Sequence, residues 1–157
     1  MAWWLWCAVA WAGAPDLSGT WVLDPAASDP VDALLEVSGA SWIERKAAAK
    51  MSVTQVLAQT ADTLVVTVDS SFMDRTDTLR LDGAPVRTQD KKGHPMTITT
   101  SWVGDVLVTT VVPDDPTLPA MTTRRSLSGG RATMTQTVVV SVGGQEVSAD
   151  RVFRRAP

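Results

Sequence analysis

Two short helical segments interrupt a chain whose remaining pattern is that of β-strands. They follow one strand-like segment that contains Gly19-Thr20-Trp21, and only strand patterns come after them. Two such helices cannot form a layer of their own, so they must cover another element. In a closed β-barrel the part that needs covering is an open end. The pattern therefore predicts a capped barrel with a hollow interior, a structure suited to binding a ligand.

Ten strand-like runs alternate with turn signals of the Asp-Gly and Gly-Gly kind. The runs fall near Gly19–Asp24, Ser52–Gln59, Thr63–Asp69, Met73–Leu81, Ala84–Thr88, Met96–Val103, Val106–Val112, Pro119–Leu127, Arg131–Ser141 and Gln145–Arg154. Short strands joined by hairpin turns are typical of an antiparallel meander. We therefore expect an all-β fold, a ten-stranded antiparallel up-and-down β-barrel, with a helix-turn-helix lid between the first and second strands.

Both helices of the lid carry start signals. Asp29 is expected to cap the first helix, with Pro30 at its first position. Ser41 and Glu44 form a capping box for the second helix, which is expected to continue to Lys50.

Composition narrows the classes of function. The chain has 157 residues, 45% of them hydrophobic and 20% charged, as expected for one globular domain with a core. The net charge of −3 argues against nucleic acid as a partner, because phosphate backbones attract proteins with a basic surplus. We expect a single lipid-binding β-barrel domain over residues 13–157.

The first residues are expected to be a signal peptide. Residues 1–14 carry no charge, hold the only cysteine (Cys7), and end in overlapping small-x-small patterns. We expect cleavage after Ala12, so that residues 1–12 are removed and the protein is periplasmic or secreted in a bacterium. The alternative is an uncleaved segment, which would leave the protein anchored to a membrane or in the cytoplasm.

Several short motifs, in collinear order, carry a resemblance to a known family. They are Ser18-Gly19-Thr20-Trp21, Asp32-Ala-Leu-Leu35, Gly39, Arg45-Lys46, Ser70-Ser71-Phe72 with Thr76, and Asp150-Arg151-Val152-Phe153. Over Leu17 to Arg154 the chain resembles the fatty-acid-binding proteins, the ten-stranded members of the calycin superfamily. The resemblance implies a barrel that binds and carries a fatty acid or a related lipid, and we expect a monomer without a cofactor.

In that family two inward arginines and a tyrosine hold the carboxylate of the ligand. The resemblance places them on Arg125, Arg151 and Phe153, the last of which lacks the tyrosine hydroxyl. Strand alternation also turns both arginines inward, because Arg125 shares its face with Met121 and Arg151 shares its face with Ala149. A guanidinium is suited to a buried carboxylate because it provides charge and paired donors.

A structural role is the alternative for the arginines near the C-terminus. In calycins such a side chain can close the barrel by stacking on the tryptophan of the first strand, which is Trp21 here. Arg151, Arg154 and Arg155 are the candidates for this contact.

One aromatic residue, Trp42, is expected on the lid, and another, Phe72, is expected near the portal. Trp42 and Phe72 are candidates for lining the path of the ligand, although ordinary lid packing explains them too. A basic tract at Arg45, Lys46 and Lys50 could make transient contact with an acidic membrane, or it could simply be a solvated helix face.

Nothing in the sequence favours an enzyme. His94 has no second histidine or nearby cysteine, so we expect an exposed turn residue and not a metal ligand. Asp114 and Asp115 offer too few oxygens for calcium. Two hypotheses remain: a carrier of a small hydrophobic ligand, and a barrel with a filled interior that acts as an interaction module, for example through the loop Pro113–Pro119.

Overall fold

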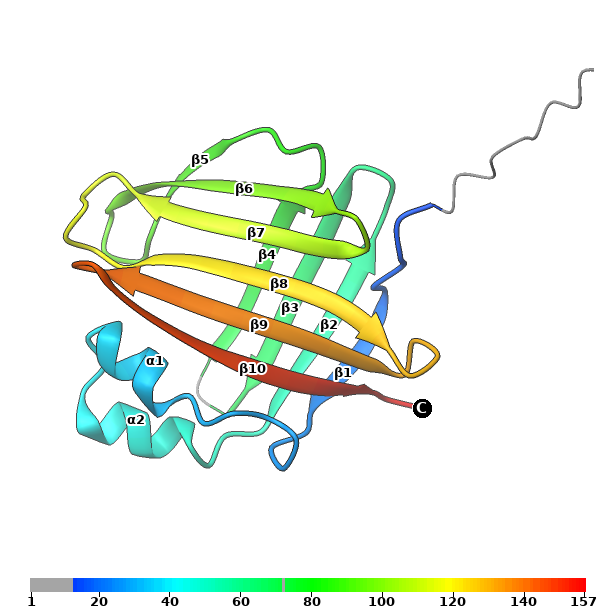
Figure 1. Cartoon of the computed structure of the whole chain (residues 1–157), viewed down its shortest axis with the longest axis horizontal. Coiled ribbons are helices and arrows are strands. Elements are labelled where there is room, and N and C mark those ends of the chain that lie inside the picture. Colours follow the sequence, from blue (N-terminus) through cyan, green and yellow to red (C-terminus); the bar gives the residue numbers. More distant parts are fainter. Residues whose placement is uncertain (1–12, 72) are drawn as a thin grey trace, which may run out of the picture.

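The computed structural model describes residues 13–71 and 73–157 and has an all-β fold. Ten antiparallel strands form a nearly closed barrel, with two short helices between the first and second strands, as the sequence predicts (Figure 1). The strands are β1 (Gly19–Leu23), β2 (Val53–Gln59), β3 (Thr63–Ser70), β4 (Met73–Arg80), β5 (Val86–Gln89), β6 (Pro95–Val103), β7 (Val106–Pro113), β8 (Ala120–Ser128), β9 (Thr133–Val142) and β10 (Gln145–Arg155). The helices are α1 (Asp32–Val37) and α2 (Trp42–Ala48). The expected signal peptide lies outside the described residues, and the division at residue 12 stays a prediction.

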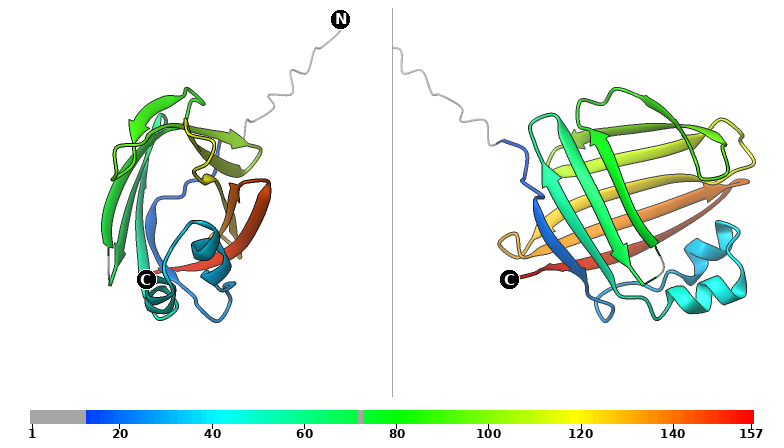
Figure 2. Two further views of the ribbon diagram at one scale, coloured as in Figure 1. Left: turned by 90° about the vertical axis from the view of Figure 1, so that its left-hand side faces the viewer. Right: turned by 180° about the vertical axis from the view of Figure 1, so that it is seen from behind.

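The strands follow one another around the barrel in chain order, with a single break. The sheet order is β4-β3-β2-β1-β10-β9-β8-β7-β6-β5, so that β1 closes the barrel by pairing with both β2 and β10. Trp21 of β1 lies opposite Gln55 on one side and Arg155 on the other. The ladder is open between β4 and β5, and the barrel is seen end-on in the left view of Figure 2.

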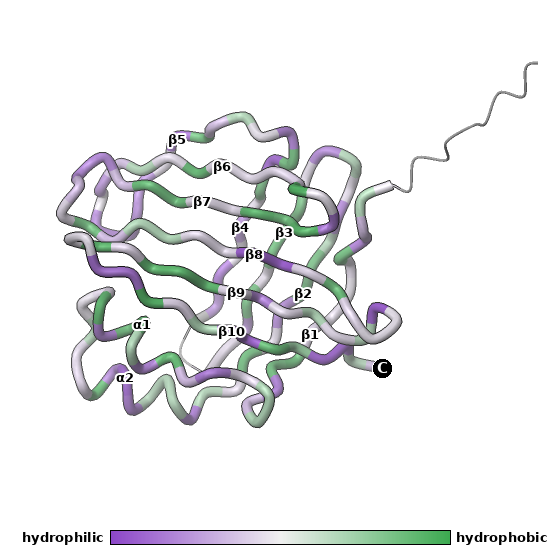
Figure 3. Tube along the Cα trace, in the orientation of Figure 1, coloured by the Kyte–Doolittle hydropathy of each residue, from purple (hydrophilic) through white to green (hydrophobic). Residues whose placement is uncertain are grey.

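The interior at the end near the N-terminus is filled by a hydrophobic core. Inward side chains alternate with outward ones along the strands, as on β2, where Gln55 and Leu57 are buried and Val56 between them is exposed. In Figure 3, hydrophobic segments run along β3 and β7, which face this core. The core residues are Leu17, Trp21, Leu23, Leu57, Leu64, Val66, Leu79, Leu81, Leu107, Met134 and Phe153.

At the same end of the barrel, an arginine near the C-terminus stacks on Trp21, and the sequence alone did not decide which arginine does so. Of the three candidate arginines, Arg155 takes this role, with its guanidinium 4.4 Å from the ring centroid of Trp21. Its Nη1 donates to the carbonyl oxygen of Ser18 at 2.7 Å. Gly19 is required beside it, because a Cβ there would overlap Arg155 Nη1 and because its φ of 142° is unfavourable for other residues.

The lid covers the opposite end of the barrel. Leu34 of α1 packs on Val140 of β9 and Ala149 of β10, in a second small cluster of buried residues. The predicted capping box of α2 is confirmed: Ser41 Oγ accepts from the Glu44 backbone N–H, and Glu44 Oε2 accepts from the Ser41 backbone N–H at 2.7 Å. Among the described residues no helix has the length and apolarity needed to cross a membrane.

The prediction that Asp29 caps α1 is wrong. The helix begins at Asp32 after Val31, which makes no side-chain cap. Asp29 instead extends the pairing of β10: its backbone N–H donates to the Asp150 carbonyl oxygen, and its Oδ2 accepts from the Asp150 N–H, both at 2.8 Å. The side chain is therefore committed to holding the connection between β1 and α1 against the barrel.

Candidate functional site

An internal cavity of about 230 Å³ lies between the filled core and the lid. Its apolar lining is provided by Val66, Val68, Leu79, Ile98, Val111, Met121 and Val138. Its polar lining is provided by Gln55, Arg75, Asp77, Thr109, Thr123, Arg125 and Gln136. Apolar and polar residues thus contribute equally to the lining, which gives this cavity more polar groups than small-molecule sites usually have.

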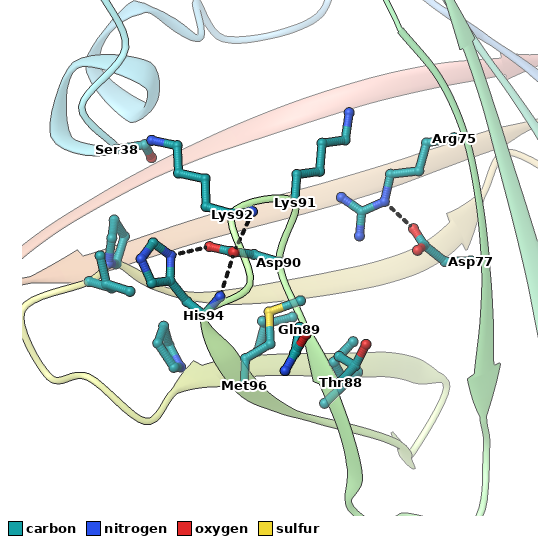
Figure 4. A pocket seen from close by; sticks show the side chains of 15 residues that line it. Ser38, Arg75, Asp77, Thr88, Gln89, Asp90, Lys91, Lys92, His94 and Met96 are labelled. Atoms are coloured by element: carbon teal, nitrogen blue, oxygen red, sulfur yellow. Dashed lines mark hydrogen bonds and ion pairs between the residues drawn. The ribbon is translucent and has the colours of Figure 1, made fainter.

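The cavity adjoins a wider pocket at the mouth of the barrel. This mouth pocket has a volume of about 670 Å³, and Arg75, Asp77, Ile98 and Val111 line both spaces. Figure 4 shows the mouth pocket between the connection from β5 to β6 and the strands β4, β6 and β7, with Ser38 at the edge of the lid.

One ion pair and one histidine–carboxylate hydrogen bond border the mouth pocket. Arg75 Nε lies 2.6 Å from Asp77 Oδ2, and His94 Nδ1 lies 2.7 Å from Asp90 Oδ2 (Figure 4). The hydrogen bond from the His94 side chain, with backbone donors in the same loop, lowers the pKa of Asp90 to about 2. His94 lies in the predicted turn and is half-exposed, but it also lines the mouth pocket. The described residues contain no cluster of three or more metal-ligating side chains.

Arg125 is the buried one of the two arginines that line the cavity, since the Arg75 side chain is 47% exposed. Arg125 is 7% exposed, whereas the neighbouring Arg124 is exposed on the outer face, so the prediction from strand alternation is confirmed for its direction. Its Nε is buried without a hydrogen-bond partner, and no carboxylate of the described residues lies within 4.0 Å. Burial lowers the pKa of Arg125 to about 10, an effect that the nearby charge of Asp77 opposes, and Arg125 stays charged at neutral pH.

Two glutamines complete the polar group around Arg125, and the sequence analysis did not single them out. Gln55 Nε2 of β2 donates to Gln136 Oε1 of β9 at 2.8 Å, which links opposite walls of the barrel. Gln136 lies directly opposite Arg125 in the register of β8 and β9. The available signal was strand alternation, since Gln55 shares a face with the core residue Leu57 and Gln136 shares one with Met134.

Arg151 lies in the same row as Arg125 but has a different partner. Its register partner on β9 is also Gln136, so the two arginines flank one glutamine across three strands. Its Nη1 donates to the carbonyl oxygen of Asp29 at 2.6 Å, and partial burial lowers its pKa. The structure thus brings both arginines near Gln136 while Arg151 also holds the connection to the lid. Its contact with a ligand stays a prediction.

The remaining predicted site residues lie apart from this group. Phe153 is 3% exposed and belongs to the filled core with Trp21 and Met134. Trp42 is 65% exposed on the outside of α2, with Lys46 Nζ 5.9 Å from its ring centroid. Phe72 lies outside the described residues. The roles of these three residues toward a ligand stay predictions.

Solved structures of a fatty acid transporter, a lipid binding protein and a fatty-acid-binding protein share the fold described above. Among solved structures, the chain is similar to the REP1-NXSQ fatty acid transporter, with 18% identity over 90% of this chain and 97% of that one, and a TM-score of 0.73. Lipid binding protein 8 of Caenorhabditis elegans matches with 16% identity over 88% and 94% and a TM-score of 0.75. Human cRBP IV matches with 20% identity over 90% and 99% and a TM-score of 0.71.

These similarities establish the fold. No protein-family model and no curated protein sequence matches the chain. What the chain binds therefore has to be inferred from its own cavity.

Proposed function

We propose that this protein binds and carries a small hydrophobic ligand, a fatty acid or a related lipid, inside the barrel. The observation that carries the proposal is a buried guanidinium, that of Arg125, which has no carboxylate within 4.0 Å among the described residues and lines a cavity beside the mouth pocket. A charge in such a place is unfavourable unless it gains an anionic partner. The names of the similar structures, a fatty acid transporter and a lipid binding protein, support the same class of ligand.

The energetics suit a carrier. Burial of a tail of about fourteen methylenes contributes roughly 11 kcal/mol at about 0.8 kcal/mol each. Association costs of about 4–15 kcal/mol offset much or all of this gain, and at the low end of these costs about 7 kcal/mol remains, which corresponds to an affinity of roughly 10 micromolar. The tail then sets the strength of binding, and Arg125 sets the orientation of the head group. This role requires no catalysis.

Binding of a fluorescent apolar dye, and its displacement by a fatty acid, tests the proposal. We expect saturable binding of an anilinonaphthalene dye, displacement by hexadecanoate, and a change in the fluorescence of Trp21 or Trp102, which belong to or pack against the core. Mass spectrometry of lipids extracted from the natively purified protein identifies the natural ligand. Failure to bind the dye and any lipid would favour the alternative, an interaction module with a filled interior.

Arg151 is proposed as a second contact for the carboxylate. If it contacts the ligand, Arg151→Ala weakens binding of hexadecanoate much more than binding of hexadecanol. Equal losses for the two ligands would show that its hydrogen bond to Asp29 is its whole role. Arg154→Ala is the matched control, because Arg154 is exposed on the outer face and pairs with Asp24.

We also propose that α2 touches acidic membranes when ligand is exchanged. Trp42 and Ile43 are 65% and 72% exposed, and Lys46 lies beside Trp42. Apolar and aromatic side chains next to lysines are typical of an interfacial helix.

Export to the periplasm or the exterior remains part of the proposal. The mass of the protein isolated from a bacterial host tests it, since cleavage after Ala12 would remove residues 1–12. A full-length mass in the cytosolic fraction would contradict it.

A further inference from the structure

Gln55 has a buried acceptor that no described residue satisfies. The side chain is 5% exposed, and its Nε2 is used in the hydrogen bond to Gln136. Its Oε1 is buried and, within residues 13–71 and 73–157, has no hydrogen-bond partner. Buried polar atoms are satisfied in the great majority of proteins, so an orphan acceptor in a cavity wall needs an explanation.

The orphan acceptor and the orphan donor of the cavity are linked. Gln136 is hydrogen-bonded to Gln55 and lies opposite Arg125 in the strand register. Arg125 Nε is the other buried polar atom of the cavity lining without a partner in the described part of the chain. One short row of side chains therefore offers a positive donor at one end and a neutral acceptor at the other.

The other polar groups around the cavity are better satisfied. Thr100 donates to Thr109 Oγ1 at 3.1 Å, and Arg75 pairs with Asp77 at 2.6 Å. A plain carboxylate would match Arg125 but would leave Gln55 Oε1 without a donor, because an ionised carboxylate only accepts hydrogen bonds. The arrangement is thus incomplete for a simple fatty acid.

We propose that Gln55 is a specificity-determining residue for ligands whose head group carries a hydrogen-bond donor next to the anionic group. The donor, a hydroxyl or an amide N–H near the carboxylate, is accepted by Gln55 Oε1 while Arg125 holds the carboxylate. This describes 2- or 3-hydroxy fatty acids and N-acyl amino acids as a chemical class. The inference rests on the proposed function, since it concerns the head group of the same lipid.

Matched ligands on the unmodified protein provide the first test. Hexadecanoate, 2-hydroxyhexadecanoate, 3-hydroxyhexadecanoate and 16-hydroxyhexadecanoate are compared by displacement of the anilinonaphthalene dye. We expect at least one of the 2- and 3-hydroxy acids to bind about three- to tenfold more tightly than hexadecanoate, the gain of one net hydrogen bond. The 16-hydroxy acid, whose hydroxyl lies at the far end of the chain, should gain nothing.

The variant Gln55→Met then assigns the effect to this side chain. It keeps the length of the residue and removes the acceptor, so the advantage of the hydroxy acid should disappear while hexadecanoate still binds. Gln145→Met is the matched control, because Gln145 is exposed at the start of β10. It should leave the preference unchanged.

The outcomes separate this inference from the proposed function. Equal affinities for hexadecanoate and both the 2- and 3-hydroxy acids in the unmodified protein would overturn the inference and leave the carrier intact. A hydroxyl advantage that persists in a folded Gln55→Met variant would also overturn it. If none of the acids binds, the proposed function itself fails.

Discussion

Replacement of Arg125 by methionine should move stability and ligand affinity in opposite directions. In the free protein the guanidinium is 7% exposed, with an unpartnered Nε. A buried unsatisfied polar group costs about 1–3 kcal/mol, and apolar replacements of buried charges are often stabilising. We therefore expect the free energy of unfolding of Arg125→Met to rise by about 1–3 kcal/mol.

Binding of a fatty acid should suffer in the same variant. A hydrogen bond to a charged group contributes about 1.5–3 kcal/mol, which corresponds to an affinity loss of about 10- to 150-fold for hexadecanoate. Hexadecanol, which has no charge to neutralise, should change by no more than about threefold. The difference arises because Arg125 is expected to gain a hydrogen-bonded anion only in the complex; in the free protein its charged neighbour Asp77 lies beyond 4.0 Å.

Urea denaturation and dye displacement measure the two effects. With a slope of about 2 kcal/mol per molar urea, the midpoint should rise by about 0.5–1.5 M. Arg124→Met is the control, since Arg124 faces outward on the same strand and should change stability by less than about 0.5 kcal/mol. A destabilised Arg125→Met that loses both ligands equally would refute the reasoning, because Arg125 would then be a structural residue.

Three other predictions concern separate parts of the molecule. His94→Gln should raise the pKa of Asp90 from about 2 toward 3.8, and NMR titration of the carboxyl carbon measures the change. Because the pKa of Asp90 is lower in the folded state than in the unfolded state, its contribution to stability is present above about pH 4. That contribution is lost as the pH falls toward 2. An unchanged Asp90 titration would exclude His94 as the cause. Gly19→Ala should lower the free energy of unfolding by about 1–3 kcal/mol, measured in urea, since a Cβ there overlaps the Arg155 guanidinium at positive φ; a neutral effect would contradict this contact. Trp42→Ala should slow ligand transfer to vesicles rich in anionic lipid, followed by fluorescence, without changing affinity, and an unchanged rate would argue against membrane contact by α2.

The strands and the capping box of α2 could be predicted because their causes are local. Strand alternation requires only neighbouring residues, and it placed Arg125 inside and Arg124 outside. The capping box depends on Ser41 and Glu44 alone. The prediction that Asp29 caps α1 was wrong although its local signal was equally good. Asp29 instead hydrogen-bonds to the backbone of Asp150, which is 121 residues away in the chain and cannot be identified from local sequence.

The sequence by itself determined the ten strands, the position of the lid and the inward direction of the cation, since these follow from the periodicity and turn chemistry of short segments. Only the tertiary structure decided that Gln55 meets Gln136, 81 residues later in the chain, and that Arg155 covers Trp21. It also decided how far the core fills the barrel below the cavity. The glutamine contact joins β2 and β9, which are not neighbours, and the arginine contact forms only where β10 closes the barrel against β1. Both therefore depend on how the sheet closes and on the volumes of all the inward side chains together.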